Sequence, residues 1–454
     1  MRERLIVIGG DAGGMSAASQ ARKRRGPDEL EIIAFERGHY TSYSACGIPY
    51  YLGGVVEVFD KLIVRTPEDF RQKYSIDART GHEAIEIDLD KRAVRTVDGG
   101  GTETWEGFDR LVVATGGTPK RFDWPGADAL GVFGVQVLDD AVAIERYMEE
   151  HAPRTAVVVG GGYIGLQMAE AFVNRGLDVT LVEAAPAPMT SLDPDMGGLV
   201  ADALREMEIR VMTDEPVEGF EVDGERVTAV VTAQGRIPAD VVVLGLGTDP
   251  NTSLAQAAGI PIGPTGGVKV DRRMETDVDG VYSAGDCAEK FHLVSRLPVA
   301  IALGTHANKE GRVAGINLSG GYATFPGVLG TAMAKICGYE VARTGLKEID
   351  AQRAGFRTVT ATVDSTTRAG YYPGAEPITT KLIVEQRSGR LLGAQIVGKQ
   401  GAAKRIDAVA TALWNEMTVD EMLNLDLGYA PPFSPLWDPI LIAARKAWDA
   451  VEGR

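Results

Sequence analysis

The sequence predicts an α/β protein with two Rossmann-like β-α-β units and a C-terminal α+β region. Two glycine-rich turns, each between an apolar strand and a helix-like segment, predict the two units. After about residue 325 the pattern changes to alternating strand-like runs and a helix over 402–417, which predicts the third region. We expect the first unit to span 1–118 and 246–324, the second 119–245 and the third 325–454.

The first unit starts with the apolar run 5–8, which ends in the glycine cluster GGDAGG. A helix-like segment follows, and the next strand ends in Glu36, 22 residues after Gly14. This order is typical of a dinucleotide site, because glycines let the backbone approach a pyrophosphate and the acid accepts hydrogen bonds from ribose hydroxyls. Asp11 stands where the second glycine of GxGxxG is expected. Its carboxylate would repel a pyrophosphate, so either the side chain points away or the loop binds more weakly than usual.

The second unit repeats the order with a complete GxGxxG. The strand 156–159 leads into Gly160–Gly165, and the strand 179–182 ends in Glu183. Two full units in one chain indicate dinucleotide binding far more strongly than a single glycine turn does. An acid at position 183, with no Arg or Lys at 184–186, favours a free ribose 2′-hydroxyl over a 2′-phosphate. The sequence therefore predicts NADH in preference to NADPH.

The composition excludes several classes of protein. The 47 Lys and Arg against 63 Asp and Glu give a net charge of −16, which argues against general nucleic-acid binding. Three scattered cysteines do not form a disulfide framework or a metal-ligand pattern, so we expect a reducing, cytoplasmic setting and no metal. The N-terminus enters a strand at once, which leaves no room for a signal peptide, and no apolar stretch approaches the length of a membrane span.

The segment TSYSACGIPY at 41–50 carries Cys46. The alternative to a functional thiol is a buried cysteine that acts as a small apolar side chain. The segment begins five residues after the acid of a dinucleotide unit, and glycine and proline follow the cysteine, which favours a redox thiol instead. Cys287 and Cys337 lack such a frame and are expected to be packing residues.

Together these features resemble the pyridine nucleotide–disulfide oxidoreductases, flavoproteins with two dinucleotide sites. The resemblance covers nearly all of the chain: ATGG at 114–117 is similar to the junction motif, Gly285-Asp286 to the second FAD motif, and the part after about 325 to the dimerisation domain. It implies FAD-site residues Gly9, Gly10, Ala12, Gly13, Gly14, Glu36, Arg37, Ser42, Ala114, Thr115, Gly116, Gly285 and Asp286. It implies NAD(P)H-site residues Gly160, Gly162, Tyr163, Ile164, Gly165 and Glu183.

Within that family the chain resembles the single-cysteine branch, which includes coenzyme A (CoA) disulfide reductases, CoA-persulfide or polysulfide reductases, NADH oxidases and NADH peroxidases. Cys46 has no partner five residues away, and the segment LDLGYAPPFSPLWDP contains no His. The segments SYSACGIPYYLGG, GYYPGAEP, KRIDAVATAL and YAPPFSP are similar to the CoA-linked group. Ala12 stands where oxidases and peroxidases usually have a His, which favours a thiol or persulfide substrate. Ala45 and Trp437 depart from the CoA-linked pattern, in which an Asn and a charged residue are common.

The resemblance also implies roles for residues outside the glycine loops. Tyr429, and Tyr371 or Tyr372, are expected to reach the active site of the partner subunit in a homodimer. Substrate-binding residues are expected among Arg22, Ser42, Lys404 and Arg405. The basic run 22–25 is equally expected as a solvated helix end that complements the helix dipole.

These expectations combine into one mechanism with two alternatives. NADH passes hydride to FAD, reduced FAD reduces a Cys46 mixed disulfide with CoA, and Tyr429 of the partner subunit protonates the leaving thiolate. The thiol needs a lowered pKa, which we expect the following helix N-terminus and the flavin to supply. One alternative is an NADH oxidase in which Cys46 cycles through a sulfenate and oxygen is the acceptor. The other is a flavin electron-transfer protein or redox sensor that acts on a protein partner.

Overall fold

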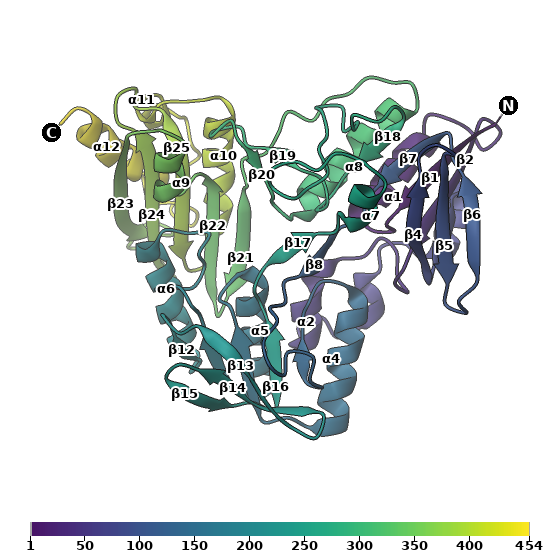
Figure 1. Ribbon diagram of the computed structural model, residues 1–454. Coiled ribbons are helices and arrows are strands. Elements are labelled where there is room, and N and C mark those ends of the chain that lie inside the picture. Colours follow the sequence, from purple (N-terminus) through teal and green to yellow (C-terminus); the bar gives the residue numbers. More distant parts are fainter. Residues whose placement is uncertain (1, 454) are drawn as a thin grey trace.

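The computed structural model describes residues 2–453. Three five-stranded sheets organise the chain (Figure 1). The first and third sheets lie on opposite sides of the molecule, and the second lies below and between them. Within the described residues, no helix combines the length and the apolar character that crossing a membrane requires.

The first sheet is parallel, in the order β18-β7-β1-β2-β3. Its strands are β1 Glu3–Ile8, β2 Leu30–Glu36, β3 Asp77–Thr80, β7 Arg110–Val113 and β18 Val281–Ser283. These strands are almost continuously apolar because both faces of the sheet are covered, one by two helices and the other largely by a small antiparallel sheet. β18, which pairs with β7 at the edge of the first sheet, follows all strands of the second sheet in the sequence.

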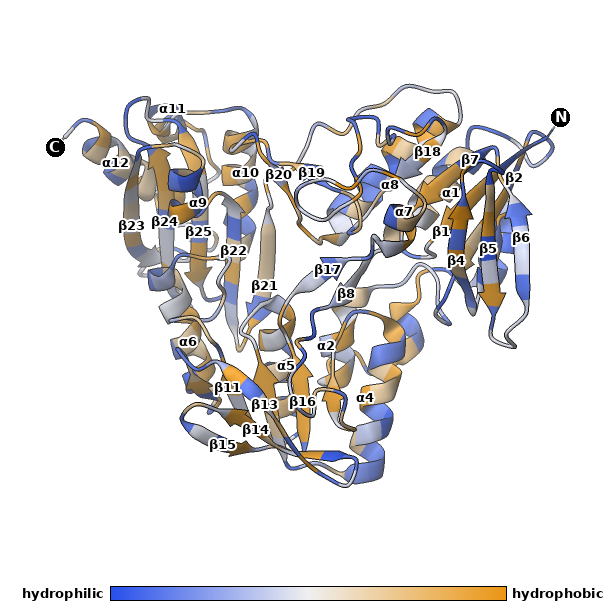
Figure 2. Ribbon diagram, in the orientation of Figure 1, coloured by the Kyte–Doolittle hydropathy of each residue, from blue (hydrophilic) through white to orange (hydrophobic). Residues whose placement is uncertain are grey.

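Two helices with many small residues pack side by side against the first sheet, α1 Ala12–Arg22 and α8 Gly304–Leu318. The same part of the molecule carries a small antiparallel sheet, which is largely exposed and polar at β6 (Figure 2). Its strands are β4 His82–Asp88, β5 Ala93–Asp98 and β6 Glu103–Gly107. The shorter helices here are α2 Ile48–Leu52, α3 Pro67–Tyr74 and α7 Ser253–Ala257.

The second sheet is also parallel, in the order β12-β11-β10-β16-β9. Its strands are β9 Val132–Phe133, β10 Thr155–Val159, β11 Asp178–Val182, β12 Arg210–Met212 and β16 Val241–Leu244. The accompanying helices are α4 Leu138–His151, α5 Tyr163–Asn174 and α6 Pro194–Glu206, and the antiparallel strands are β13 Val217–Asp223, β14 Arg226–Thr232 and β15 Gly235–Pro238. The chain enters and leaves this unit through a short antiparallel pair, β8 Gly117–Pro119 and β17 Thr248–Pro250.

The third sheet is antiparallel, in the order β21-β22-β25-β24-β23. Its strands are β21 Ala332–Ile336, β22 Tyr339–Gly345, β23 Thr358–Thr366, β24 Pro377–Glu385 and β25 Leu391–Gly398. The remaining elements are β19 Lys290–Phe291, β20 Pro298–Val299, α9 Glu348–Arg353, α10 Ile406–Trp414, α11 Val419–Leu423 and α12 Pro439–Val451. The predicted helix over 402–417 is shorter than expected, because a 3-10 turn occupies Ala403–Arg405 and the chain turns at Glu416 with a positive φ of 55°.

The fold class predicted from the sequence is confirmed: two Rossmann-like parallel sheets are followed by an α+β region. A buried ion pair joins the second and third parts, since Lys381 on β24 lies 3.1 Å from Asp193 and 2.9 Å from Asp195 at the start of α6. One hydrophobic cluster joins all three parts, since it contains Leu52 of the first, Phe172 of the second and Ile336 of the third.

Candidate functional site

A continuous cavity of about 2080 Å³ lies at the carboxyl ends of the two parallel sheets, the place where α/β folds bind ligands. Its walls come from both glycine loops, the Cys46 segment, the turn after β18, the start of α8, and β21 with α10. The cavity is larger than the roughly 300–1,000 Å³ of common small-molecule pockets. It therefore has room for more than one extended ligand.

The first glycine loop closes tightly on the strands around it. A Cβ added at Gly9, whose φ is +113°, would lie 2.0 Å from the Ala114 carbonyl oxygen, and one at Gly14 would lie 2.0 Å from the Gly9 oxygen. Glu36 fastens the loop from the end of β2, since its carboxylate accepts hydrogen bonds from Gly10 N at 2.8 Å and Gly38 N at 2.7 Å. The backbone of Gly9, Gly10 and Gly13 thus faces the cavity beside the side chains of Asp11 and Ala12.

The second glycine loop has the same construction. A Cβ added at Gly165 would lie 2.1 Å from the Gly160 carbonyl oxygen. The Glu183 carboxylate accepts hydrogen bonds from Gly161 N at 2.7 Å and Ala185 N at 2.8 Å. Each acid that ends a strand therefore organises the glycine turn beside it, and the two loops differ where Asp11 of the first replaces Gly162 of the second.

Asp11 turns its side chain toward the Cys46 segment. Asp11 Oδ1 accepts a hydrogen bond from Tyr43 N at 3.1 Å, and the residue still lines the cavity. Burial raises the pKa of Asp11 to about 6, against the hydrogen bonds from Tyr43 and Ala12, and the charges of Glu36 and Asp286 raise it further. Asp11 thus links the glycine loop to the Cys46 segment and is poised to change protonation near neutral pH.

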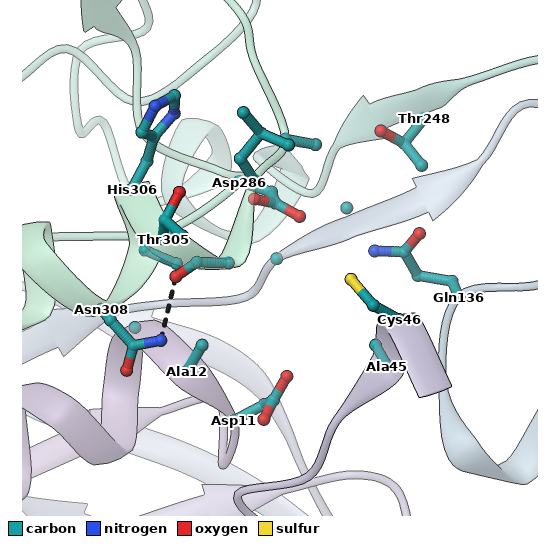
Figure 3. A pocket seen from close by; sticks show the side chains of 18 of the residues that line it. Asp11, Ala12, Ala45, Cys46, Gln136, Thr248, Asp286, Thr305, His306 and Asn308 are labelled. Carbon is teal, nitrogen blue, oxygen red and sulfur yellow. Dashed lines mark hydrogen bonds between the residues drawn. The ribbon is translucent and has the colours of Figure 1, made fainter. Parts of the chain in front are cut away.

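Cys46 lies in a 3-10 turn, Ala45–Gly47, at the junction of the two units. Ser42 N donates to the Gly10 carbonyl at 3.0 Å on one side, and Ser44 N donates to the Leu62 carbonyl at 2.8 Å on the other. The helix that follows, α2, packs against α5 of the second unit. Figure 3 shows the Cys46 sulfur next to Gln136, with the Asp286 carboxylate on its other side and Thr248 farther away.

The Cys46 side chain is exposed to the cavity, unlike that of the buried Cys287. Desolvation by the cavity walls raises the pKa of the Cys46 thiol, and Asp11 and Asp286 add to the effect. The expectation of a lowered pKa is met only in part by the chain's own groups, because a backbone hydrogen bond at Cys46 lowers the pKa but desolvation outweighs it. The helix α2 has only five residues and brings little dipole, whereas two carboxylates share the cavity with the thiol.

The other residues predicted for the first dinucleotide site are also gathered around the cavity. Ala12, Gly13, Arg37, Ala114, Thr115, Gly116, Gly285 and Asp286 line it, as do Gly160, Gly162, Tyr163 and Ile164 of the second loop. Gly14, Gly165 and Ser42 lie behind the lining and shape the loops from within.

The predicted tyrosines lie elsewhere, on the surface of the third region. Tyr371 and Tyr429 are 78% and 47% exposed, and neither they nor Tyr372 line the cavity of their own chain. The Tyr371 hydroxyl donates a hydrogen bond to the neighbouring Tyr429 hydroxyl, which raises the pKa of Tyr371. The two motifs that carry these residues, distant in sequence, therefore meet on one exposed face.

The predicted cationic residues separate into two groups. Lys404 lines the cavity and pairs with Asp407. Arg405 instead binds Asp438 at 3.0 Å and the carbonyls of Thr367 and Phe433, so it fastens the two tyrosine-bearing segments to each other. Arg22 donates to the carbonyls of Arg25 and Ser75, both at 3.0 Å, and lies outside the cavity lining.

Sequence reasoning missed the contribution of α8. Its first turns place Thr305, His306 and Asn308 on the cavity, followed by the exposed cations Lys309 and Arg312. The available signal was the run of polar residues GTHANKEGR that follows the apolar stretch after Gly285-Asp286. No group of three or more His, Cys, Asp or Glu side chains within residues 2–453 is placed to hold a metal ion.

Comparison with protein families identifies residues 3–311 with the model described as "Pyridine nucleotide-disulphide oxidoreductase" and residues 331–439 with its dimerisation domain. The chain belongs to the pyridine nucleotide-disulphide oxidoreductases. Such oxidoreductases carry FAD and use NAD(P)H, which are two dinucleotide cofactors. The resemblance predicted from the sequence is confirmed.

Individual relatives of this oxidoreductase span almost all of its length. The NAD(P)H coenzyme A polysulfide/persulfide reductase of Pyrococcus horikoshii is 38% identical over 98% of both chains. The NADH oxidase of Methanocaldococcus jannaschii is 37% identical, again over 98% of both. Among solved structures, a NAD-dependent persulfide reductase from A. fulgidus is 40% identical and has a TM-score of 0.96. The match covers 99% of this chain and 84% of the reductase.

Both glycine loops of this oxidoreductase fit the cofactors that the family uses. At each loop a side chain would collide with the neighbouring backbone, and bare amides face a cavity large enough for two dinucleotides. The carboxylates of Glu36 and Glu183 stand where ribose hydroxyls are bound in such folds.

Proposed function

We propose that this oxidoreductase transfers electrons from NADH, through FAD, to a CoA persulfide, polysulfide or disulfide at Cys46. The observation that carries the proposal is a single accessible thiol in the cavity that both glycine loops share. Within residues 2–453 no second cysteine lines that cavity, because Cys287 is buried beside Ser283 and Cys337 lies in the turn between β21 and β22. The second sulfur of any disulfide must therefore arrive with the substrate.

The division of labour among the domains follows from the sheets. We assign FAD to residues 1–118 with 246–324, because β18 and the Gly285-Asp286 turn complete the first sheet. NADH is assigned to 119–245, which holds the second glycine loop. The region 325–454 is assigned to the contact between two copies in a homodimer, which the matching dimerisation domain supports. Three free cysteines favour a reducing, cytoplasmic setting.

The sulfur chemistry at Cys46 has two parts. The Cys46 thiolate attacks one sulfur of the CoA disulfide or persulfide: a bond forms between the two sulfurs, the original S–S bond breaks, and the leaving thiolate or hydrosulfide takes up a proton. A pair of electrons then breaks the new disulfide and returns the Cys46 thiolate and a CoA thiolate. FAD, when bound, supplies that pair after receiving it from NADH as hydride.

Protons come from the third region of the partner in this proposal. Tyr429 is exposed, lies beside Tyr371, and is absent from the cavity lining of its own chain. These properties suit a proton donor that completes the site of the other subunit. Tyr371 is assigned to hold Tyr429 in place. Tyr372, its neighbour in the YYPG motif, is the weaker candidate for this role.

CoA carries several phosphates, and cations on the cavity suit them. Lys404 of the predicted set lines the cavity, and Lys309 and Arg312 join it from α8. Arg405 is committed to holding Asp438 and the tyrosine-bearing segments, so we remove it from the substrate-binding set. Arg22 could bind a phosphate of CoA only by giving up its hydrogen bonds to the carbonyls of Arg25 and Ser75.

One experiment separates this function from its alternatives. Purified protein with bound FAD is mixed with NADH, and turnover is followed with CoA persulfide, CoA disulfide and oxygen as the only acceptor in turn. We expect the sulfur acceptors to be used at least about tenfold faster than oxygen. The Methanocaldococcus relative named an NADH oxidase makes oxygen the specific rival, and faster oxygen use would establish it. Slow rates with every small acceptor would favour a protein partner instead.

A pH-dependent affinity for FAD is expected from Asp11. Its pKa is about 6, and an adjacent pyrophosphate favours the protonated form, so FAD binding takes up a proton. Affinity should be greatest below pH 6 and fall as pH rises above it, by up to about tenfold per pH unit. Asp11→Asn should flatten this profile in a fluorescence titration. A wild-type profile that is flat between pH 5.5 and 7.5 would show that the charge of Asp11 is not coupled to the phosphates of FAD.

The choice of nucleotide is expected to depend on Glu183. Its carboxylate at the end of β11 repels a 2′-phosphate, and Ala184 provides no cation. We expect Glu183→Ala with Ala184→Arg to shift the ratio of kcat/KM from NADH toward NADPH by about 100-fold. The matched control is Glu36→Ala, which should weaken FAD binding without changing the nucleotide preference. A natural preference for NADPH would contradict the assignment.

A further inference from the structure

A buried ion pair contacts the turn that carries Asp286 on the side away from the cavity. Lys290 and Glu310 have side-chain exposures of 1% and 0%, and their charged atoms lie 3.5 Å apart. Lys290 comes from β19, and Glu310 from the second turn of α8. Neither residue lines the cavity, whereas Gly285 and Asp286 do.

Both members of the pair bind the backbone of the same glycine. Gly285 N donates to Glu310 Oε2 at 2.8 Å, and Lys290 Nζ donates to the Gly285 carbonyl at 2.8 Å. Lys290 also donates to the Ala288 carbonyl at 2.9 Å. Gly285 has a φ of +89°, a conformation that favours glycine, so the pair holds the turn in a shape that few other residues adopt.

Stability alone does not account for these two charges. A buried ion pair is often no more stabilising than apolar residues of the same volume, although removing one partner is costly. Glu310 Oε1 has no hydrogen-bond partner among the described residues, and burial raises the pKa of Glu310 against the opposing effect of Lys290. His306 and Lys309 on α8 and Asp286 in the turn are the other charged or titratable groups around the pair.

We propose that Lys290 and Glu310 are positioning residues, which fix the Gly285 peptide so that Asp286 presents its carboxylate to FAD. The inference rests on the assignment of FAD to the first unit. It predicts that the pair acts on the cofactor through Asp286 and not through the fold as a whole. Each hydrogen bond between a charged group and the Gly285 backbone is strong enough to change the equilibrium constant for FAD binding by roughly 10- to 100-fold.

The test follows holoenzyme variants on heating, with FAD release read by flavin fluorescence and unfolding by far-ultraviolet circular dichroism. The variants are Lys290→Met, Glu310→Gln and the double change, which leaves neither charge unpaired. We expect about 30-fold weaker FAD binding in each single variant, and release at a temperature clearly below unfolding. The double variant should unfold later than either single variant and still release FAD early. Lys381→Met, which breaks a buried pair far from Gly285, is the control and should unfold early without early release.

The outcomes separate the inference from the proposed function. If release and unfolding shift together in all variants, the pair is structural and the inference is overturned. If the double variant regains wild-type FAD affinity, the charges do not position Asp286, and the inference is again overturned. A wild-type protein that holds no FAD would instead overturn the function itself.

Discussion

Replacing Cys46 by Ser is expected to lower turnover with CoA persulfide or CoA disulfide by at least about 1,000-fold, because a hydroxyl does not form the mixed disulfide. Reduction of bound FAD by NADH should continue, since the second glycine loop and Glu183 are untouched. The two half-reactions are separated by stopped-flow absorbance of the flavin, first with NADH and then with the sulfur acceptor. FAD content should match that of the wild type.

The control for this variant is Cys337→Ser, which changes a half-buried thiol outside the cavity. Its turnover should equal that of the wild type. Retained turnover in Cys46→Ser would remove the thiol from the reaction. It would leave direct electron transfer from FAD to an acceptor, as in the flavin electron-transfer alternative.

The second large effect is expected from Gly165→Ala. The added methyl group would lie 2.1 Å from the Gly160 carbonyl oxygen, so the second glycine loop must shift. A displacement of about 1 Å in a binding element costs about 100-fold, and we expect the KM for NADH to rise by that factor. FAD content and the chemical reduction of the flavin by dithionite should not change.

Gly198→Ala is the matched control, because a Cβ there meets no atom within 4 Å on helix α6. It should leave the KM unchanged and raise the free energy of unfolding by up to about 1 kcal/mol, since alanine is the better helix former. If Gly165→Ala binds NADH normally, the nucleotide does not use the Gly160–Gly165 loop.

Much of the fold and half of the site follow from local sequence patterns. A glycine turn between an apolar strand and a helix, with an acid at the end of the next strand, predicts a Rossmann-like unit and its ligand-binding loop. The positions of Glu36 and Glu183 beside the glycine loops are therefore predictable from the sequence. Cys46 was found because its turn is adjacent in sequence to Glu36.

What the sequence did not reveal depends on contacts between distant segments. Lys309 and Arg312 reach the cavity because α8 packs on α1, a contact that no local pattern encodes. Arg405 resembled a phosphate ligand, but it binds Asp438 and two carbonyls that are brought near by the third sheet. Desolvation by the cavity walls raises the pKa of Cys46, and Asp11 and Asp286, which are 35 residues before and 240 residues after the thiol, add to the effect.

Asp11 illustrates the same division. The sequence showed a carboxylate where a glycine is usual and left two interpretations open. The hydrogen bond from Tyr43 N to Asp11 Oδ1 favours the first, in which the side chain turns from the phosphates toward the Cys46 segment. Burial, together with the charges of Glu36 and Asp286, raises the pKa of Asp11 to about 6, so its charge changes with pH in the range where FAD binding would be measured.

The central claim is that Cys46 forms a disulfide with a sulfur supplied by the substrate. Its most direct test is the intact mass of the protein after incubation with CoA disulfide in the absence of NADH. The account predicts one CoA per chain, attached at Cys46 and released when NADH is added. A protein that gains no CoA, or that keeps the CoA after NADH has reduced the flavin, would contradict it.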